Sequence, residues 1–245
     1  MKEIRIAAMC RTGQHGIIAW MKAQLEKAGE SVHFENDVGV RFGLNKKMAI
    51  HDYPEASVLM YNYEDPDLKS LHDASKEQEL REDVEYKDVL IMRDPFNQFA
   101  SRLKYSYSSI IKRSWKDSKI QENFIQMWKN HAREFLGQTQ HLTRNPVCIS
   151  FNKWFSDIEY RRALSESLKI PFSDEGLDIH GTESSFDNIK VQTPGARKMT
   201  VLYRWRDVQN ESIYRKIFQD KELIRLSNLI FDGFSEAKKE LIDAI

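Results

Sequence analysis

The sequence predicts a single α/β domain over residues 1–245, with a central parallel sheet of about five strands flanked by helices. Short apolar runs rich in β-branched residues alternate with stretches of helical periodicity along most of the chain. Parallel neighbours in a sheet need crossover connections, which the intervening helices supply. The 245 residues are 41% hydrophobic and 30% charged, so the chain can bury one substantial core and fits one domain better than two.

Five apolar runs are the predicted strands, and each is short enough to cross a sheet once. They are residues 4–9, 31–34, 58–61, 89–92 and 147–151. His33 lies on the second run, where we expect a hydrogen-bonded core histidine. Ligands of open parallel sheets bind beyond the carboxyl ends of the strands, so the residues that follow each run are the candidates for a site.

Helical periodicity defines most of the stretches between the strands. The predicted helical stretches are residues 15–28, 67–86, 96–112, 119–137, 157–168 and 209–243, the last with Gly233 as a possible break. In the stretch 119–137, Trp128 and His131 fall at helical spacing with other apolar residues, which predicts packing. Residues 35–55 and 172–200 have little periodicity, and the first of these is a loop of a length typical of substrate contact.

Charge and cysteine content exclude several classes of protein. The formal net charge is +0 and the pI is about 7.1, so no overall field favours nucleic acid or an anionic membrane, and an anion site must be built locally. Cys10 and Cys148 lie in or beside apolar runs and indicate small core residues rather than a disulfide framework. The sequence runs directly into a strand and holds no stretch of about 18 apolar residues, which predicts a cytoplasmic protein that does not span a membrane.

The turn after the first strand is the strongest local signal. Residues 10–16 read Cys-Arg-Thr-Gly-Gln-His-Gly between a strand and a helix. Gly13 and Gly16 allow a tight turn whose N–H groups, together with those of the helix start, face an anion. Arg11 adds a permanent charge suited to phosphate or sulfate oxygens, and Thr12 adds a hydroxyl. The alternative is an ordinary strand-to-helix turn with an incidental arginine.

This turn differs from the P-loop of nucleotidases at an informative place. The P-loop needs Gly-Lys-Ser/Thr, in which the lysine reaches the terminal phosphates and the hydroxyl holds Mg²⁺. Here Gln14 and His15 follow Gly13, and neither is an obvious magnesium ligand. We therefore expect an anion that is bound by Arg11 and the loop amides without a metal ion.

A second signal follows the fourth predicted strand. Arg93 leaves that strand at its carboxyl end, and Ser101 lies two helical turns further on, so both can reach one anion across the helix start. This arrangement suits a phosphate group. Asp94 is the expected cap of the helix.

The two signals together resemble motifs of the sulfotransferases that use 3′-phosphoadenosine 5′-phosphosulfate (PAPS). A strand that ends in Arg93-Asp94-Pro95, with Ser101 eight residues after the arginine, is similar to the 3′-phosphate-binding motif of that family. The turn Arg11-Thr12-Gly13 resembles the loop that wraps the 5′-phosphosulfate. Near the other end of the chain, residues 204–207, Arg-Trp-Arg-Asp, with the helix that follows them, resemble the family's C-terminal segment. The loop that contains Ser184, Ser185, Phe186, Arg197 and Lys198 resembles its flap over the nucleotide.

The resemblance implies a P-loop-like sulfotransferase fold and a set of nucleotide contacts. The cofactor is then PAPS, the product is 3′-phosphoadenosine 5′-phosphate (PAP), and a sulfuryl group passes to a hydroxyl or amine of a small-molecule acceptor. The implied nucleotide-binding residues are Arg11, Thr12, Gly13, Gln14, His15, Gly16, Arg93, Ser101, Arg197, Lys198 and Arg204. Two alternatives stay open: a nucleotide-dependent phosphotransferase, and a catalytically silent nucleotide-binding protein, which the unusual Gln14-His15 pair favours.

Sulfuryl transfer also needs a base for the acceptor proton, and the sequence leaves that base open. Arg11 is the expected clamp on the leaving phosphate and the sulfuryl oxygens. Candidates for the base follow predicted strands or lie in the first two loops. They are His15, Glu35, Asp37, Glu64 and His51.

Overall fold

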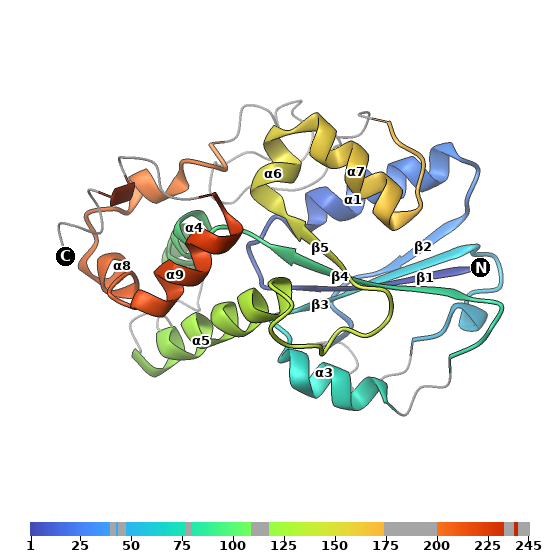
Figure 1. Ribbon diagram of the computed structural model, residues 1–245, viewed down its shortest axis with the longest axis horizontal. Coiled ribbons are helices and arrows are strands. Elements are labelled where there is room, and N and C mark those ends of the chain that lie inside the picture. The colour runs from blue at the N-terminus through green and yellow to red at the C-terminus, as the bar shows by residue number, and fades with distance from the viewer. Residues whose placement is uncertain are drawn as a thin grey trace.

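The computed structural model describes residues 1–39, 43, 48–76, 80–108, 118–173, 200–232 and 238–239 (Figure 1). Its elements alternate along the chain as the sequence predicts. The strands are β1 (Lys2–Ala8), β2 (Val32–Glu35), β3 (Val58–Glu64), β4 (Glu85–Met92) and β5 (Val147–Ser150). The α-helices are α1 (Gln14–Lys27), α3 (Leu68–Ser75), α4 (Pro95–Ser108), α5 (Ser118–Phe135), α6 (Phe151–Ser156), α7 (Ile158–Leu168), α8 (Ser212–Ile217) and α9 (Lys221–Ile230), with short 3₁₀ turns η1 (Ile50–Asp52) and η4 (Arg204–Asp207).

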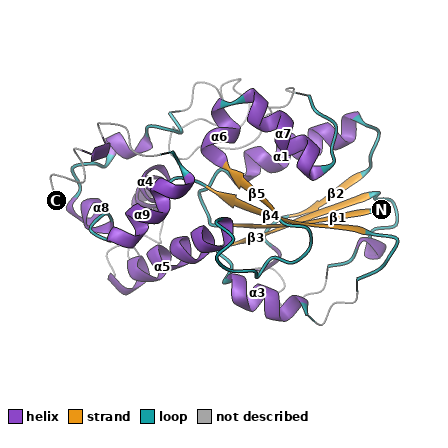
Figure 2. Ribbon diagram, in the orientation of Figure 1, coloured by secondary structure: helices purple, strands orange, loops and turns teal. Residues whose placement is uncertain are grey.

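The five strands form one parallel sheet in the order β2-β3-β1-β4-β5 (Figure 2). Ala8, at the carboxyl end of β1, lies opposite Glu64 of β3 and Ile91 of β4. The three central strands therefore end at the same edge. This arrangement confirms the predicted parallel α/β sheet, and it brings the segments after β1, β3 and β4 together.

Helices cover both faces of the sheet. In Figure 1, α1, α6 and α7 lie on one face and α3 and α5 on the other, whereas α4, α8 and α9 lie beyond the carboxyl ends of the strands. Alternate β1 residues serve the two layers, since Ile4 and Ile6 pack in one apolar cluster and Ala7 in the other. Trp20 and Trp128 are each fully buried, one in each layer.

Buried polar residues join the strands near their amino ends. Arg5 of β1 lies opposite Asp88 of β4 in register, and its guanidinium donates to both carboxylate oxygens at 2.8 and 2.9 Å. Arg144 donates to Glu3 at 2.9 Å, and the Tyr61 hydroxyl donates to the same carboxylate at 2.8 Å. Burial raises the pKa of Glu3, although Arg144 opposes this.

Several element boundaries differ from the sequence prediction because local caps end or start helices. The predicted stretch 67–86 is α3 alone, whose start is capped by Asp67 through Ser70 N at 2.8 Å, and β4 already begins at Glu85. Over residues 209–232, the predicted stretch 209–243 is divided into α8 and α9, because Asp220 caps a new start by accepting from the backbone N–H groups of Glu222 and Leu223. Gly233 lies outside the described residues.

The buried histidine of α5 is confirmed as a packing residue, and the histidine of β2 is not in the core. His131 is buried, with Nε2 3.1 Å from the Pro66 carbonyl oxygen, and burial lowers its pKa to about 4. Trp128 is buried and donates to the Arg93 carbonyl at 3.2 Å. His33 is 37% exposed because β2 is an edge strand.

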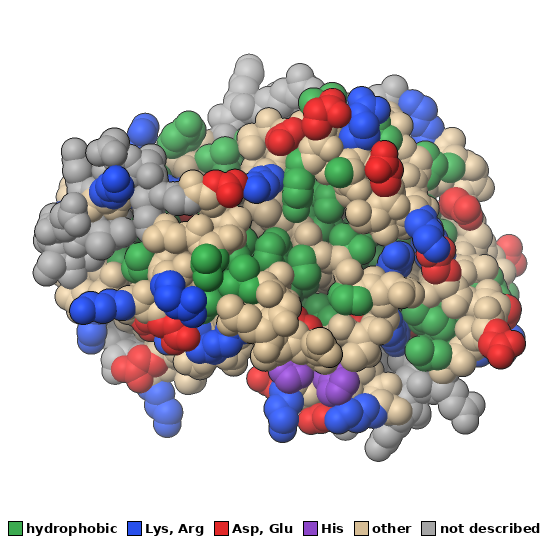
Figure 3. All heavy atoms as spheres, viewed as in Figure 1, with side chains coloured by type: hydrophobic (Ala, Val, Ile, Leu, Met, Phe, Trp, Pro, Cys, Tyr) green, Lys and Arg blue, Asp and Glu red, His purple; other side chains and the backbone are tan. Residues whose placement is uncertain are grey.

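The surface agrees with the balanced charge of the sequence. On the face shown in Figure 3, basic and acidic side chains are intermixed, with no extended area of one sign. Within the described ranges, no helix combines the length and apolarity that a membrane crossing needs.

Candidate functional site

The turn between β1 and α1 forms a compact cradle at the carboxyl edge of the sheet. Arg11 and Gly13 adopt left-handed backbone conformations, with φ of 72° and 88°, and Thr12 N donates to the Met9 carbonyl at 3.2 Å. A Cβ at position 13 would overlap the Phe151 ring. Gly13 is therefore required here both by its backbone conformation and by the space available.

The start of α1 presents donors to this cradle. Gly13 is the N-cap residue, so no side chain caps the helix, and the first turn contains no acidic residue. The helix start therefore combines N–H groups that have no intrahelical partner with the positive end of the helix dipole. The Thr12 hydroxyl oxygen is buried without a hydrogen-bond partner in the described part of the chain. An anion in the cradle would accept hydrogen bonds both from these helix N–H groups and from the Thr12 hydroxyl.

Three arginines lie at the carboxyl ends of the strands, two of them in contact with Ser101. The Ser101 hydroxyl accepts from Arg11 Nε at 3.1 Å and from Arg204 Nη1 at 3.2 Å. Arg93 donates to the Arg11 carbonyl at 3.2 Å and to the Val201 carbonyl, and its guanidinium lies 5.0 Å from the Phe151 ring centroid. We call Arg11, Arg93, Ser101 and Arg204 the arginine cluster. Ser101 and Arg93 are almost completely buried, so their positions are fixed by packing.

Asp94 and Asn97 hold the C-terminal segment against α4. Asp94 caps this helix by accepting from Asn97 N at 3.0 Å, as predicted, and it also accepts from Asn152 Nδ2 at 2.8 Å. Asn97 Nδ2 in turn donates to the Leu202 carbonyl at 3.0 Å. These contacts place residues 200–205 beside α4 and so bring Arg204 to Ser101.

The Glu64 carboxylate and the His15 imidazole lie together next to the cradle. Glu64 Oε1 accepts from Gln14 Nε2 at 2.6 Å and lies 3.2 Å from His15 Nε2. The hydrogen bond with His15 holds the pKa of Glu64 below its usual value, although burial opposes this. Asp37 accepts from Glu64 N at 3.3 Å, so it also belongs to this edge.

Two further residues of this edge were not singled out from the sequence. Asp65 accepts from Cys10 N at 2.9 Å and from the Arg102 guanidinium, which also lies 4.2 Å from the Phe124 ring centroid. Burial raises the pKa of the Cys10 thiol to about 12, so it stays neutral. Asp65 could have been chosen because it follows a strand, whereas no sequence signal distinguishes Arg102.

The structure does not bring every predicted residue to the cradle. Glu35 lies on the edge strand, where its carboxylate is 2.9 Å from His33 Nε2. His51 is exposed in η1, near Asp83 just before β4, and thus at the amino ends of the strands. The structure therefore does not bring His51 to the cradle. Arg197 and Lys198 lie outside the described residues.

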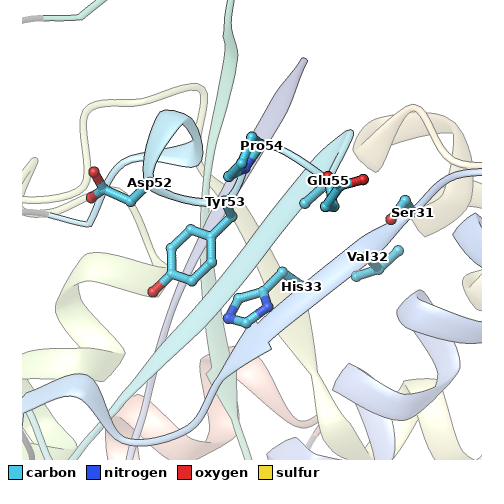
Figure 4. A pocket seen from close by; sticks show the side chains of 8 residues that line it. Ser31, Val32, His33, Asp52, Tyr53, Pro54 and Glu55 are labelled. Atoms are coloured by element: carbon cyan, nitrogen blue, oxygen red, sulfur yellow. The ribbon is translucent and has the colours of Figure 1, made fainter.

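A pocket of about 340 Å³ lies beside β2 (Figure 4). The Tyr53 ring stacks on His33 with centroids 4.0 Å apart, and Pro54 and Ser31 also line this pocket. The residues that line it come from the start of β2 and from positions 52–56, and none of them belongs to the cradle or the arginine cluster.

Comparison of the sequence with protein-family models and with curated proteins finds no match. Among solved structures, mouse sulfotransferase SULT7A1 complexed with PAP is similar over 100% of this chain and 89% of that chain, with 12% identity and a TM-score of 0.52. A sulfotransferase domain from the curacin biosynthetic pathway matches 88% of this chain and 95% of that domain, with 12% identity and a TM-score of 0.44. The chain thus has the P-loop-like sulfotransferase fold that the motifs predicted.

Proposed function

We propose that this protein is a PAPS-dependent sulfotransferase that transfers a sulfuryl group to a hydroxyl or amine of a small-molecule acceptor. The arginine cluster is the observation that carries the proposal. Two guanidinium groups from segments far apart in the sequence converge on one buried serine, and a third lies against the adjoining turn. Such planar, permanently charged donors suit a ligand with several phosphate groups.

The cradle and the cluster divide the nucleotide between them. Arg93, Ser101 and Arg204 would hold the 3′-phosphate, and Arg11, Thr12 and the amides of residues 13–15 would hold the 5′-phosphosulfate, since the Gly16 amide already donates to the Gly13 carbonyl at 3.1 Å. The buried Thr12 hydroxyl fits this assignment, since it lacks a partner among the described residues and would donate to a phosphate oxygen. The PAP complex of the mouse enzyme that shares the fold supports the same choice of ligand. Arg197 and Lys198 would add charge to the 3′-phosphate.

The residues of the chain supply binding and electrostatic stabilisation, and PAPS supplies the activated sulfuryl group. Arg11 and the amides at the start of α1 would stabilise the negative charge that grows on the leaving phosphate oxygen. Because Arg11 delivers this charge, the proposed transfer needs no divalent metal. An acceptor would approach from the side of Glu64 and His15, which adjoins the cradle.

A thermal-shift comparison tests the proposed ligand. PAP at a hundredfold excess over its dissociation constant should stabilise the protein by roughly 3 kcal/mol, and ATP with Mg²⁺ should have little effect. Stabilisation by ATP with Mg²⁺ alone would favour a phosphotransferase instead. Stabilisation by PAP without conversion of PAPS, tested with phenols, amines and water as acceptors, would identify a silent nucleotide-binding protein.

A further inference from the structure

His15, Glu64 and Gln14 form one hydrogen-bonded group at the start of α1. His15 and Gln14 are the first two residues of α1, and Glu64 is the last residue of β3. Both side chains from α1 meet the same carboxylate oxygen, at 3.2 and 2.6 Å. Three side chains from two elements are thus held together beside the proposed phosphosulfate loop.

We propose that His15 is the catalytic base through Nδ1, and that Glu64 and Gln14 are positioning residues that orient it. This inference rests on the proposed sulfotransferase function. It names a residue for removal of the acceptor proton, which neither the cradle nor the arginine cluster performs.

The chemistry of the Glu64 carboxylate fixes which imidazole nitrogen accepts the proton. An ionised carboxylate only accepts hydrogen bonds, so His15 Nε2 must carry the hydrogen that it shares with Glu64. In the neutral ring, Nδ1 then has the free lone pair. The His15 side chain is 43% exposed, which leaves the ring accessible to an acceptor.

Gln14 and Asp37 keep Glu64 in the orientation that this pairing needs. Gln14 Nε2 donates to the same oxygen that faces His15, and the Glu64 backbone N–H donates to Asp37. The hydrogen bond with His15 lowers the pKa of Glu64 although burial opposes this, so Glu64 is itself a weak base. Its negative charge instead stabilises the imidazolium that forms on His15, against the opposing dipole of α1.

The other ionisable groups described around His15 and Glu64 are not suited to remove the acceptor proton. Cys10 and Asp65 lie beside Glu64, and Arg102 is engaged by Asp65. Cys10 is a neutral thiol, and the Asp65 carboxylate already accepts from a backbone N–H and a guanidinium. Among the predicted bases, Glu35 is paired with His33, and His51 lies at the amino ends of the strands.

The proposed step balances as follows. The acceptor O–H or N–H bond breaks, and its proton moves to His15 Nδ1. The acceptor lone pair forms the new bond to sulfur, while the bond from sulfur to the 5′-phosphate oxygen breaks and leaves its electron pair on that oxygen. Arg11 stabilises the negative charge that forms on the leaving phosphate oxygen, and Glu64 stabilises the positive charge that forms on His15.

The first test needs neither cofactor nor turnover. In ¹⁵N-histidine-labelled protein, long-range ¹H–¹⁵N spectra distinguish the two neutral tautomers, and the His15→Gln variant assigns the signal. We expect the Nε2–H form of His15 in the full chain, and a shift toward a mixture of tautomers in Glu64→Gln. A His15 ring protonated at Nδ1 in its neutral form would overturn the assignment of Nδ1 as the base.

The second test uses two acceptors that differ in their need for a base. Phenol is neutral under mildly alkaline conditions, whereas 4-nitrophenol is largely ionised and needs no proton acceptor. In single-turnover conversion of PAPS, His15→Ala should slow phenol sulfation by about 100-fold or more and leave the 4-nitrophenol rate much less affected. Glu64→Gln should act in the same direction with a smaller loss, and both variants should still bind PAP.

His33→Gln is the matched control, since it removes the histidine of a similar His–Glu pair at 2.9 Å that lies away from the cradle. Its rates should equal those of the unmodified chain. If His15→Ala slows both phenols equally, or neither, His15 is not the base while sulfuryl transfer itself stands. If the unmodified chain binds no PAP, the proposed function fails before this question arises. If it binds PAP but converts no PAPS with phenols, amines or water, both the transfer and the base are refuted.

Discussion

Arg11 is the residue on which the proposed chemistry most depends, and replacing it tests that role. Its Nε lies 3.1 Å from Ser101 Oγ, and its backbone follows β1 into the cradle. If the guanidinium bridges the leaving 5′-phosphate and the sulfuryl group, the contact strengthens as the bond breaks. Loss of one such donor costs about 3 to 4 kcal/mol in the transition state, so Arg11→Ala should lower kcat by roughly a hundred- to a thousandfold.

The fold should survive this change, which keeps the result interpretable. Arg11 has a φ of 72°, and alanine and lysine, which also carry a Cβ, meet the same backbone strain. Ser101 keeps its hydrogen bond from Arg204. The stability of Arg11→Ala should therefore fall by only about 1 kcal/mol, the usual contribution of one hydrogen bond.

Kinetics at saturating PAPS distinguish catalysis from simple attraction. Arg11→Lys should recover part of kcat, because it restores the charge but not the planar two-point geometry. Arg206→Ala is the matched control, since this arginine is exposed and lies 4.8 Å from the Tyr203 ring centroid. If Arg11 only steers the nucleotide, KM rises with kcat almost unchanged. An unchanged kcat in Arg11→Ala would refute the proposed role.

Three further changes have defined outcomes. Gly13→Ala should lower the free energy of unfolding, measured in urea, by about 2 to 4 kcal/mol, because the added methyl group meets the Phe151 ring. Gly137→Ala is the control: it has a φ of 70° but open space around it, and it should cost only about 1 kcal/mol. Equal losses in the two variants would contradict the steric argument. Turnover in excess chelator should equal turnover without it, and a large loss restored by Mg²⁺ would return the phosphotransferase to first place. His131 has a folded pKa of about 4 against 6.5 in its ordinary state, so the unfolded chain binds the extra proton and stability should fall as the pH drops from 6.5 to 4, by about 3 kcal/mol in all. His131→Gln should flatten that dependence in urea melts, and an unchanged slope would show that His131 titrates normally.

The sheet and half of the site were predictable because their signals are local. The apolar runs fix the strands by composition, and each strand is followed at once by the residues that reach its carboxyl edge. Arg11, Arg93 and the glycine turn therefore lie directly after the carboxyl ends of β1 and β4. Asp94 was recognised as a cap because capping uses residues only three apart.

The remainder depends on contacts between segments far apart in the sequence. Arg204 reaches Ser101 because Asn97 and Arg93 hold the carbonyls of Leu202 and Val201, and no spacing encodes those contacts. The Arg5–Asp88 pair is a buried charge inside two apolar strands, which hydrophobic patterning cannot anticipate. The position of His51 at the amino ends of the strands could not be anticipated either, because residues 35–55 have little periodicity from which their placement could be read.

The central claim is that Arg93, Ser101 and Arg204 of the arginine cluster recognise a 3′-phosphate, and isothermal titration with PAP and with adenosine 5′-monophosphate tests it most directly. The two ligands differ only in the 3′-phosphate. In Arg93→Ala, PAP affinity should fall by about 10- to 100-fold, which corresponds to one or two charge-assisted hydrogen bonds, while affinity for the monophosphate should stay nearly constant. Ser101→Ala should give a smaller loss with the same selectivity. An equal loss for both ligands, or no preference for PAP in the unmodified chain, would contradict the account.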